Sequence, residues 1–116
     1  MVVDDDEFIV KILTRRLVAN GYLVLSAASG AELLAKLPSF RPDGILLDVM
    51  MPGMDGVQVA ELLGRRPSTS RIPIVFVSAL IGPDHAQDSP ANPLHHYLGK
   101  PFEPEVLMAL LKRIGL

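Results

Sequence analysis

Residues 44–56 read GILLDVMMPGMDG, and this stretch contains the clearest structural signal of the 116-residue chain. The run 44–48 is apolar up to its last residue, a pattern typical of a strand that helices cover on both faces. Asp48 ends the run, and Pro52 and Gly53 then mark a tight turn that leads into a helix. We therefore predict a central strand with a carboxylate at its carboxyl end.

Apolar runs of strand length alternate with segments of helical period along the rest of the chain. This alternation is typical of βα units around a parallel sheet. We expect an α/β fold with a doubly wound, five-stranded parallel sheet. The expected strands lie at residues 1–3, 22–27, 44–48, 72–77 and 97–99, and the expected helices at 8–18, 29–37, 57–63 and 104–114.

The stretch 80–96 occupies the place of a fourth helix, but its composition is unfavourable for one. It contains Gly82, Pro83, Pro90 and Pro93. A proline inside a helix removes a hydrogen bond and clashes with the preceding turn, which costs about 3 kcal/mol. We therefore predict at most a shortened or distorted fourth helix.

The composition limits the classes of function. Eleven Lys and Arg against thirteen Asp and Glu give a net charge of -2, which argues against binding to nucleic acid or to an anionic membrane. The absence of cysteine excludes disulfides, thiolate metal sites and cysteine nucleophiles. No apolar run approaches the roughly 20 residues that span a bilayer, and the acidic N-terminus is unlike a signal peptide. We expect one cytoplasmic domain over residues 1–116.

Acidic, hydroxyl and amine side chains follow the expected strands. Asp4 and Asp5 follow the first strand and Asp48 ends the third. Ser78 follows the fourth and Lys100 the fifth, so all five side chains are expected at one edge of the sheet. Three carboxylates repel one another unless a hard cation such as Mg²⁺ neutralises them. The site suits phosphoryl transfer, with Asp48 as the nucleophile and Lys100 and Ser78 on the phosphoryl oxygens.

The same residues carry a resemblance to a known family. Residues 2–5 (VVDD), residues 46–56 (LLDVMMPGMDG), Ser78 and residues 100–102 (KPF) occur in the order and spacing of its motifs. Over essentially its whole length, the chain resembles the CheY-like receiver domain of two-component response regulators. The resemblance implies the flavodoxin-like strand order 2-1-3-4-5. The resemblance implies that Asp48 accepts a phosphoryl group from a sensor histidine kinase or a phosphotransfer protein. It also implies a switch that assists its own phosphorylation and dephosphorylation, and is otherwise no enzyme.

Individual roles follow from this resemblance. Asp4, Asp5, Asp48 and the backbone carbonyl of Met50 would bind Mg²⁺, or Mn²⁺ in its place. Lys100 would contact the phosphoryl group. The domain would act on an output partner or effector domain that the sequence does not identify. Three alternatives stay open: a stand-alone receiver, a piece excised from a longer regulator, and the receiver of a hybrid kinase. Homodimerisation also stays open.

The resemblance also implies a switch. Ser78 would turn toward the phosphate and Tyr97 would change rotamer, which couples the site to an output surface. The Lys100–Pro101 peptide would be cis. An aromatic residue in an edge strand is also often simply packed, and this alternative for Tyr97 stays open.

Apolar residues occupy two positions that, in the family, influence how fast the acyl phosphate is hydrolysed. Met50 lies two positions beyond Asp48, and Leu80 lies two positions beyond Ser78. Because neither side chain can orient a water molecule, we expect slow hydrolysis of the acyl phosphate.

Other polar residues have simpler interpretations. Asp6 and Glu7 are expected to cap the first helix, where acidic groups are favourable. The three histidines, His85, His95 and His96, lie in a polar stretch, and we expect them to be solvated surface residues.

Two other classes of function compete with the phosphorylated switch. The first is a degenerate receiver that acts as a phosphorylation-independent interaction module; the prolines of residues 80–96 and the apolar Leu80 are compatible with it. The second is a turnover enzyme or a flavin carrier. A phosphatase of the Asp-x-Asp type would not have Phe8 where a Thr or Val is expected, and the acids at residues 4–6 would repel a flavin phosphate.

Overall fold

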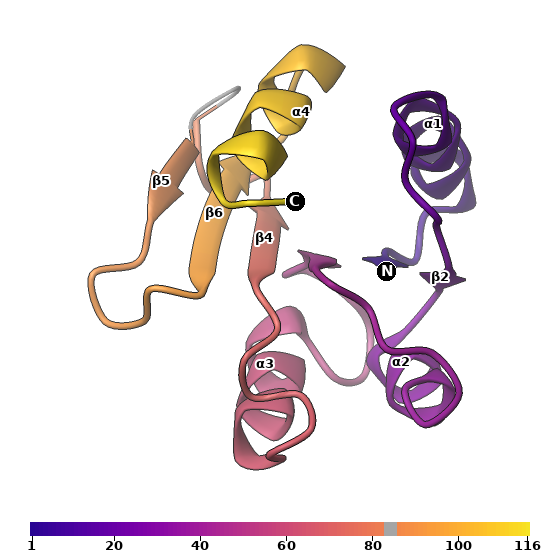
Figure 1. The fold of residues 1–116 in the computed structure, drawn as a ribbon, viewed down its shortest axis with the longest axis vertical. Helices are drawn as coiled ribbons and strands as arrows, with labels where there is room; N and C mark the ends of the chain where they lie inside the picture. Colours follow the sequence, from indigo (N-terminus) through magenta and orange to yellow (C-terminus); the bar gives the residue numbers. More distant parts are fainter. Residues whose placement is uncertain (83–85) are drawn as a thin grey trace.

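The computed structural model describes residues 1–82 and 86–116, which form a sheet between two layers of helices (Figure 1). Helices α1 and α4 lie on one face of the sheet, and α2 and α3 lie on the other. In chain order, the elements are β1 (Val2–Val3), α1 (Glu7–Ala19), β2 (Ser26–Ala27), α2 (Gly30–Lys36), β3 (Ile45–Asp48), α3 (Gly56–Arg65), β4 (Ile74–Ser78), β5 (Ala86–Asp88), β6 (His95–Gly99) and α4 (Pro104–Arg113).

Five parallel strands run in the order β2-β1-β3-β4-β6. This order confirms the predicted doubly wound α/β class and the flavodoxin-like strand order. The central strands β3 and β4 are buried along their whole length, as the apolar run at residues 44–48 predicted. Parallel pairing brings the carboxyl ends of β1, β3, β4 and β6 to the same edge of the sheet.

The five parallel strands agree with the prediction, but the short or distorted fourth helix that was expected at most is absent from the described part of the stretch 80–96. Instead, β5 pairs antiparallel with β6 as a sixth strand at the edge. Prolines at both ends of this stretch disfavour a helix, whereas a short edge strand tolerates them nearby. Gly99 allows the backbone of Gly82 to lie against β6, because a Cβ at Gly99 would collide with the carbonyl oxygen of Gly82. Pro83 and the predicted surface residue His85 lie outside the described residues.

Helices α1, α2 and α3 begin at residues whose side chains cap them, whereas α4 begins at Pro104 without a side-chain cap. The Asp6 side chain accepts hydrogen bonds from Phe8 N and Ile9 N, which confirms its predicted capping role. Asp55 caps α3 in a reciprocal arrangement with Gln58. None of the helices in the described part of the chain is long and apolar enough to cross a membrane.

Two apolar clusters fill the layers on either side of the sheet. Alternate residues of a strand face opposite sides, so Phe76 packs toward α2 and α3, and Val75 and Val77 pack toward α1 and α4. Each cluster contains some of the largest fully buried side chains. Leu33, Ile45, Leu47 and Leu63 belong to the cluster beside α2 and α3, and Leu98 and Leu107 belong to the cluster beside α1 and α4. The clusters hold the strand ends, and therefore the polar side chains beyond them, in fixed relative positions.

Candidate functional site

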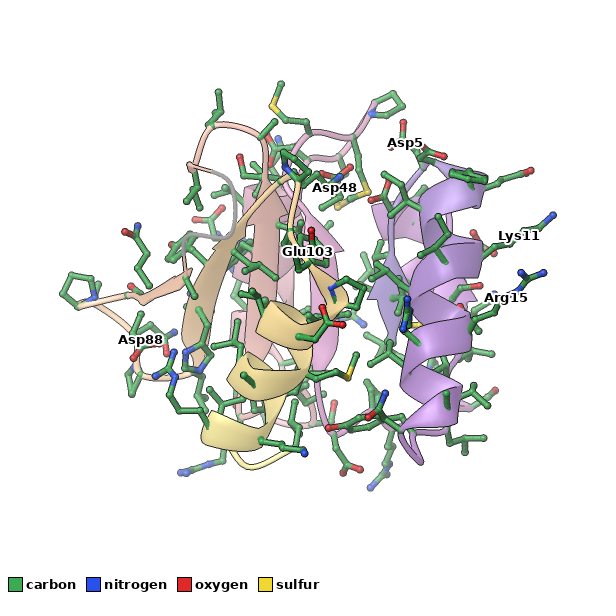
Figure 2. All side chains as sticks on the ribbon, turned by 90° about the horizontal axis from the view of Figure 1, so that it is seen from above. Asp5, Lys11, Arg15, Asp48, Asp88 and Glu103 are labelled. Carbon is green, nitrogen blue, oxygen red and sulfur yellow. The ribbon has the colours of Figure 1, made fainter. Side chains whose placement is uncertain are left out.

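The candidate site lies at the carboxyl edge of the parallel strands. Asp4 directly follows β1, Asp48 is the last residue of β3, and Ser78 is the last residue of β4. Ser78 lies opposite Gly99 in the β4–β6 register, so Lys100 follows at the same edge. Figure 2 shows Asp5 and Asp48 at this edge, far from the last turn of α4. The topology therefore gathers the predicted site residues as the sequence analysis expected.

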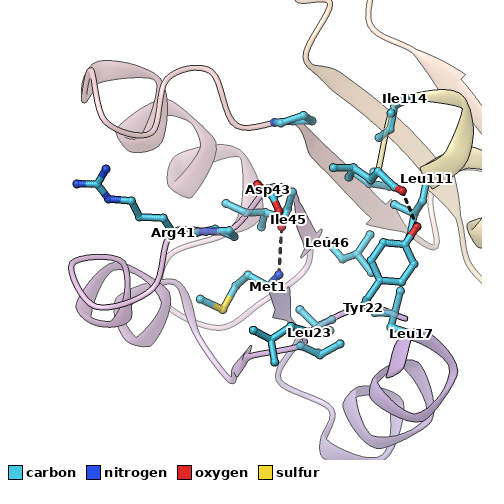
Figure 3. A pocket seen from close by; sticks show the side chains of 18 of the residues that line it. Met1, Leu17, Tyr22, Leu23, Arg41, Asp43, Ile45, Leu46, Leu111 and Ile114 are labelled. Carbon is cyan, nitrogen blue, oxygen red and sulfur yellow. Dashed lines mark hydrogen bonds between the residues drawn. The ribbon is translucent and has the colours of Figure 1, made fainter. Parts of the chain in front are cut away.

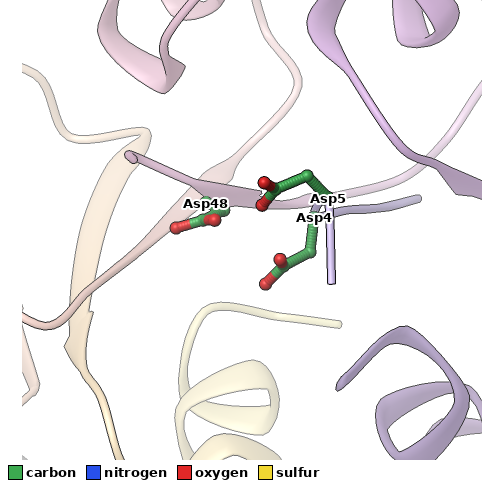
Figure 4. Close-up of side chains that lie close together, drawn as sticks. All are labelled: Asp4, Asp5 and Asp48. Atoms are coloured by element: carbon green, nitrogen blue, oxygen red, sulfur yellow. The ribbon is translucent and has the colours of Figure 1, made fainter. Parts of the chain in front are cut away.

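Three carboxylates converge there (Figure 4). Asp4, Asp5 and Asp48 each offer an oxygen atom, and these atoms lie within 4.8 Å of one another. Asp4 and Asp48 are buried, whereas Asp5 is exposed. Hard divalent cations prefer oxygen ligands and tolerate partly hydrated sites. The donor set therefore fits Mg²⁺ or Mn²⁺, with one open side toward solvent.

Lys100 lies between the two buried carboxylates. Its Nζ is 3.1 Å from Asp4 Oδ2 and 3.4 Å from Asp48 Oδ1. Burial alone would lower the pKa of Lys100, but the hydrogen bonds and negative charges of Asp4 and Asp48 outweigh burial and raise the pKa above its ordinary value. Lys100 therefore stays charged and partly neutralises the carboxylates.

For Asp48, in contrast to Lys100, the surroundings disfavour the charged form. Burial, and then repulsion from Asp4, raise the pKa of Asp48, although Lys100 and the backbone N–H of Met50 partly counteract them. The N–H of Met50 donates to Asp48 Oδ1 at 3.3 Å, and the N–H of Asp6 donates to Asp4 Oδ1 at 2.9 Å. Further positive charge at this site would stabilise the ionised form of Asp48. The predicted use of the Met50 carbonyl as a ligand stays a prediction.

Two glycines shape the loop that follows Asp48. Gly53 has a φ of 77°, a conformation that side chains other than glycine rarely adopt. A Cβ at Gly56 would lie 2.6 Å from the carbonyl oxygen of Asp48. The loop that contains the predicted Pro-Gly turn therefore packs closely against the backbone of Asp48, the candidate phosphoacceptor.

The two predicted switch residues lie on one face of neighbouring strands. Ser78 is buried, and its Oγ accepts a hydrogen bond of 3.1 Å from the N–H of Leu80. Tyr97 is half-buried, and its ring stacks on Phe76 with centroids 5.1 Å apart. Their roles as a switch stay predictions. The Lys100–Pro101 peptide is cis, as the resemblance implied.

The expectation that His95 and His96 are solvated surface residues is wrong. His96 is only 7% exposed, and its Nδ1 lies 2.7 Å from Asp88 Oδ1. His95 is half-buried and packs edge-on against Phe76. Both belong to β6, which starts two residues before the predicted strand, so their side chains face the two sides of the sheet. Asp88 was not identified from the sequence, because nothing in the sequence pairs it with His96 until the hairpin is known.

A separate cavity of about 700 Å³ lies near the amino ends of the strands (Figure 3). Met1, Tyr22, Leu46 and Leu111 are among the residues that line it. The Tyr22 hydroxyl donates to the Leu116 carbonyl at 2.9 Å. None of the predicted site residues lines this cavity, whereas Asp4, Asp48 and Lys100 line a small cleft at the carboxyl edge.

Comparisons with known proteins find response regulators and their receiver domains. A family model described as the response regulator receiver domain matches residues 1–112. The response regulator PleD of Caulobacter vibrioides is 39% identical over 114 residues, which cover 98% of this chain and 25% of PleD. The alkaline phosphatase synthesis transcriptional regulatory protein PhoP of Bacillus subtilis is 36% identical over 121 residues, which cover 98% of this chain and 47% of PhoP. The chain therefore spans a quarter to about half of these relatives.

Solved structures show the same similarity over nearly whole chains. The chemotaxis protein CheY4 of Vibrio cholerae matches with a TM-score of 0.81 and 30% identity, covering 97% of this chain and 94% of CheY4. The receiver domain of a signal transduction histidine kinase from Syntrophus aciditrophicus matches with a TM-score of 0.80 and 26% identity, covering 97% and 86%. With the family match over residues 1–112, these similarities show that the chain belongs to the response regulator receiver domain family of two-component systems.

Proposed function

We propose that this receiver domain accepts a phosphoryl group on Asp48 in a Mg²⁺-dependent reaction, from a sensor histidine kinase or a phosphotransfer protein. The observation that carries the proposal is the placement of Asp48. It is buried at the end of β3, within 4.8 Å, oxygen to oxygen, of the Asp4 and Asp5 carboxylates and within 3.4 Å of Lys100. A nucleophilic carboxylate, a cation site and a fixed amine thus lie within one small cleft.

Each residue has a distinct task in this reaction. Asp48 attacks the phosphorus atom of a phosphohistidine; a P–O bond forms, the P–N bond breaks, and the imidazole takes up a proton as it leaves. Asp4 and Asp5 would hold the cation together with Asp48. When bound, Mg²⁺ supplies positive charge against the phosphoryl oxygens. Lys100 is already charged and only partly exposed beside Asp48, so it would need only a small shift of Nζ to contact a phosphoryl oxygen.

The change in shape would begin at Ser78. Its hydroxyl hydrogen is free to rotate because Oγ acts as an acceptor for Leu80 N–H. Donation of that hydrogen to a phosphoryl oxygen would draw the end of β4 toward Asp48. Tyr97 lies on the adjoining strand beside Phe76, where a change of rotamer would alter the exposed face of β6. Output partners would recognise that altered face.

Intact-mass spectrometry tests the proposal. The chain is incubated with Mg²⁺ and a small acyl-phosphate donor, and the controls are Asp48→Asn and a chelator. The expected result is the gain of one phosphoryl group that requires both Asp48 and Mg²⁺. A phosphoryl group on Asp48→Asn would place the nucleophile elsewhere. A folded chain that binds Mg²⁺, yet gains no phosphoryl group even from histidine kinases, would favour the interaction module.

A further inference from the structure

The strand β5 is held to the body of the domain in an unusual way. Its three residues are all exposed, so burial of apolar surface contributes little to its position. The backbone pairs with β6 over three residues only. The side chain of Asp88, in the last position of β5, makes further contacts that tie the strand to β6 and α4.

Asp88 joins three elements through two hydrogen-bonding partners. Its Oδ1 is 2.7 Å from His96 Nδ1, in the directly opposite residue of β6. Arg113, in the last turn of α4, donates to both carboxylate oxygens, at 2.9 Å to Oδ2 and 3.1 Å to Oδ1. Because two N–H groups donate to two carboxylate oxygens, both the distance and the orientation of the Arg113 guanidinium relative to the Asp88 carboxylate are fixed. We call this set of residues, Asp88, His96 and Arg113, the Asp88 latch.

The latch has a buried side and a solvent side. His96 is 7% exposed and faces the same side of the sheet as Leu98, which packs against Leu107 of α4. The side chains of Asp88 and Arg113 are about half exposed. Figure 2 shows Asp88 at the outer edge of the sheet, beside α4. Solvent can therefore replace the contact between Asp88 and Arg113 without opening the apolar core.

The latch is connected to the candidate site through β6. This strand contains His96 and Tyr97, pairs with β4 along its whole length, and leads directly into Lys100. The N–H of Lys100 donates to the carbonyl oxygen of Ser78 at 2.9 Å. A displacement of Ser78 and Lys100 toward a phosphoryl group therefore pulls on the strand that the latch ties to α4.

We propose that the Asp88 latch holds β5, β6 and α4 in the unphosphorylated arrangement, and that it opens when Ser78 and Lys100 move toward a phosphoryl group on Asp48. This proposal rests on the proposed function. It assigns the conformational change to an edge strand and the last helix, in the place where a fourth helix was expected. The surface that changes is the outer face of β5 together with the last turn of α4.

Thermodynamic linkage gives a direct test. If occupation of the phosphoryl site opens the latch, then breaking the latch must favour occupation by the same factor. The probe is beryllofluoride, a mimic of a phosphoryl group, in the presence of Mg²⁺, with its dissociation constant measured by calorimetry. The variant is Arg113→Gln. Lys112→Gln is the matched control, because Lys112 lies in the same helical turn, is exposed and has no part in the latch.

We expect Arg113→Gln to bind beryllofluoride about 3- to 10-fold more tightly than the wild-type chain, an effect at the low end for coupled sites. Lys112→Gln should bind within about twofold of the wild-type chain. Asp88→Asn, which removes the charge without changing the shape of an exposed side chain, should repeat the effect of Arg113→Gln. Hydrogen exchange of the β5 and β6 amides should be faster in both latch variants.

The outcomes separate the two proposals. Faster amide exchange in the latch variants with unchanged beryllofluoride binding would overturn the proposed coupling and leave the latch a static fastening. Weaker binding in these variants would also overturn it, since the latch would then support the occupied state. A wild-type chain that binds Mg²⁺ but neither beryllofluoride nor a phosphoryl group would overturn the proposed function itself, and the latch role with it.

Discussion

Gly56→Ala is expected to destabilise the fold by forcing the loop after Asp48 away from its position. The added Cβ would lie 2.6 Å from the carbonyl oxygen of Asp48 and 3.0 Å from Val49 Cα. Both are backbone atoms, so no side-chain rotation can relieve the contact. Overpacking of this kind typically costs about 1–3 kcal/mol.

The same helix contains a matched control. Gly64 also lies in α3, but a Cβ there meets nothing within 4 Å. Alanine favours a helix over glycine by roughly 0.8–1 kcal/mol, so Gly64→Ala should be stabilising. The same chemical change at two positions of one helix should therefore have opposite signs, with a difference of about 2–4 kcal/mol in the free energy of unfolding.

Urea unfolding followed by circular dichroism measures this difference. With a slope of about 2 kcal/mol per M, the two midpoints should differ by about 1–2 M. Gly56→Ala should also slow phosphorylation by an acyl-phosphate donor, because the displaced backbone carries Asp48. A midpoint for Gly56→Ala at or above that of the wild-type chain would refute the argument that this glycine is required by close packing.

Asp48→Asn should raise the urea midpoint in the absence of Mg²⁺, because burial and Asp4 raise the pKa of the folded carboxyl. The gain should be present at pH 7 and disappear as pH falls toward the ordinary pKa of about 4, where the native carboxyl is protonated. Asp5→Asn, at an exposed position, should change stability by less than about 0.5 kcal/mol but weaken Mg²⁺ binding about tenfold or more by calorimetry. Leu80→Asn should leave stability unchanged, since Leu80 is 82% exposed, but shorten the half-life of the phosphorylated chain measured by phosphate release. An equally long half-life would argue against a role for this apolar residue.

The site was predictable from the sequence because the sheet topology determines where most of its side chains lie. In a parallel sheet, the carboxyl ends of strands share one edge, so residues that directly follow apolar runs must gather there. Asp4, Asp48 and Lys100 are each within one residue of a strand end, and the structure brings them together. Short-range patterns were sufficient because no long loop intervenes between strand and side chain.

Edge strands were less predictable because their patterns are weak. The sequence of β5 is Ala-Gln-Asp, which is exposed throughout and shows no apolar alternation. The predicted strand at 22–27 is observed only as Ser26–Ala27, because β1 offers just two residues for pairing. The burial of His96 depends on the face that it occupies in β6 and on its partner in β5. Such pairings depend on tertiary contacts that local periodicity does not encode.

The replacement of a helix by β5 leaves the site intact for a reason that is visible in the sheet. Ser78 ends β4 and Lys100 directly follows β6, and these two strands pair with each other over five residues. The spacing of the two side chains is therefore set by the β4–β6 ladder and not by the chain between them. That connecting chain can therefore change from helix to strand without moving either side chain. Its surface changes completely, however, and with it the partners that it fits. Substitutions in β5 should accordingly alter output contacts while Mg²⁺ binding at Asp4, Asp5 and Asp48 is retained.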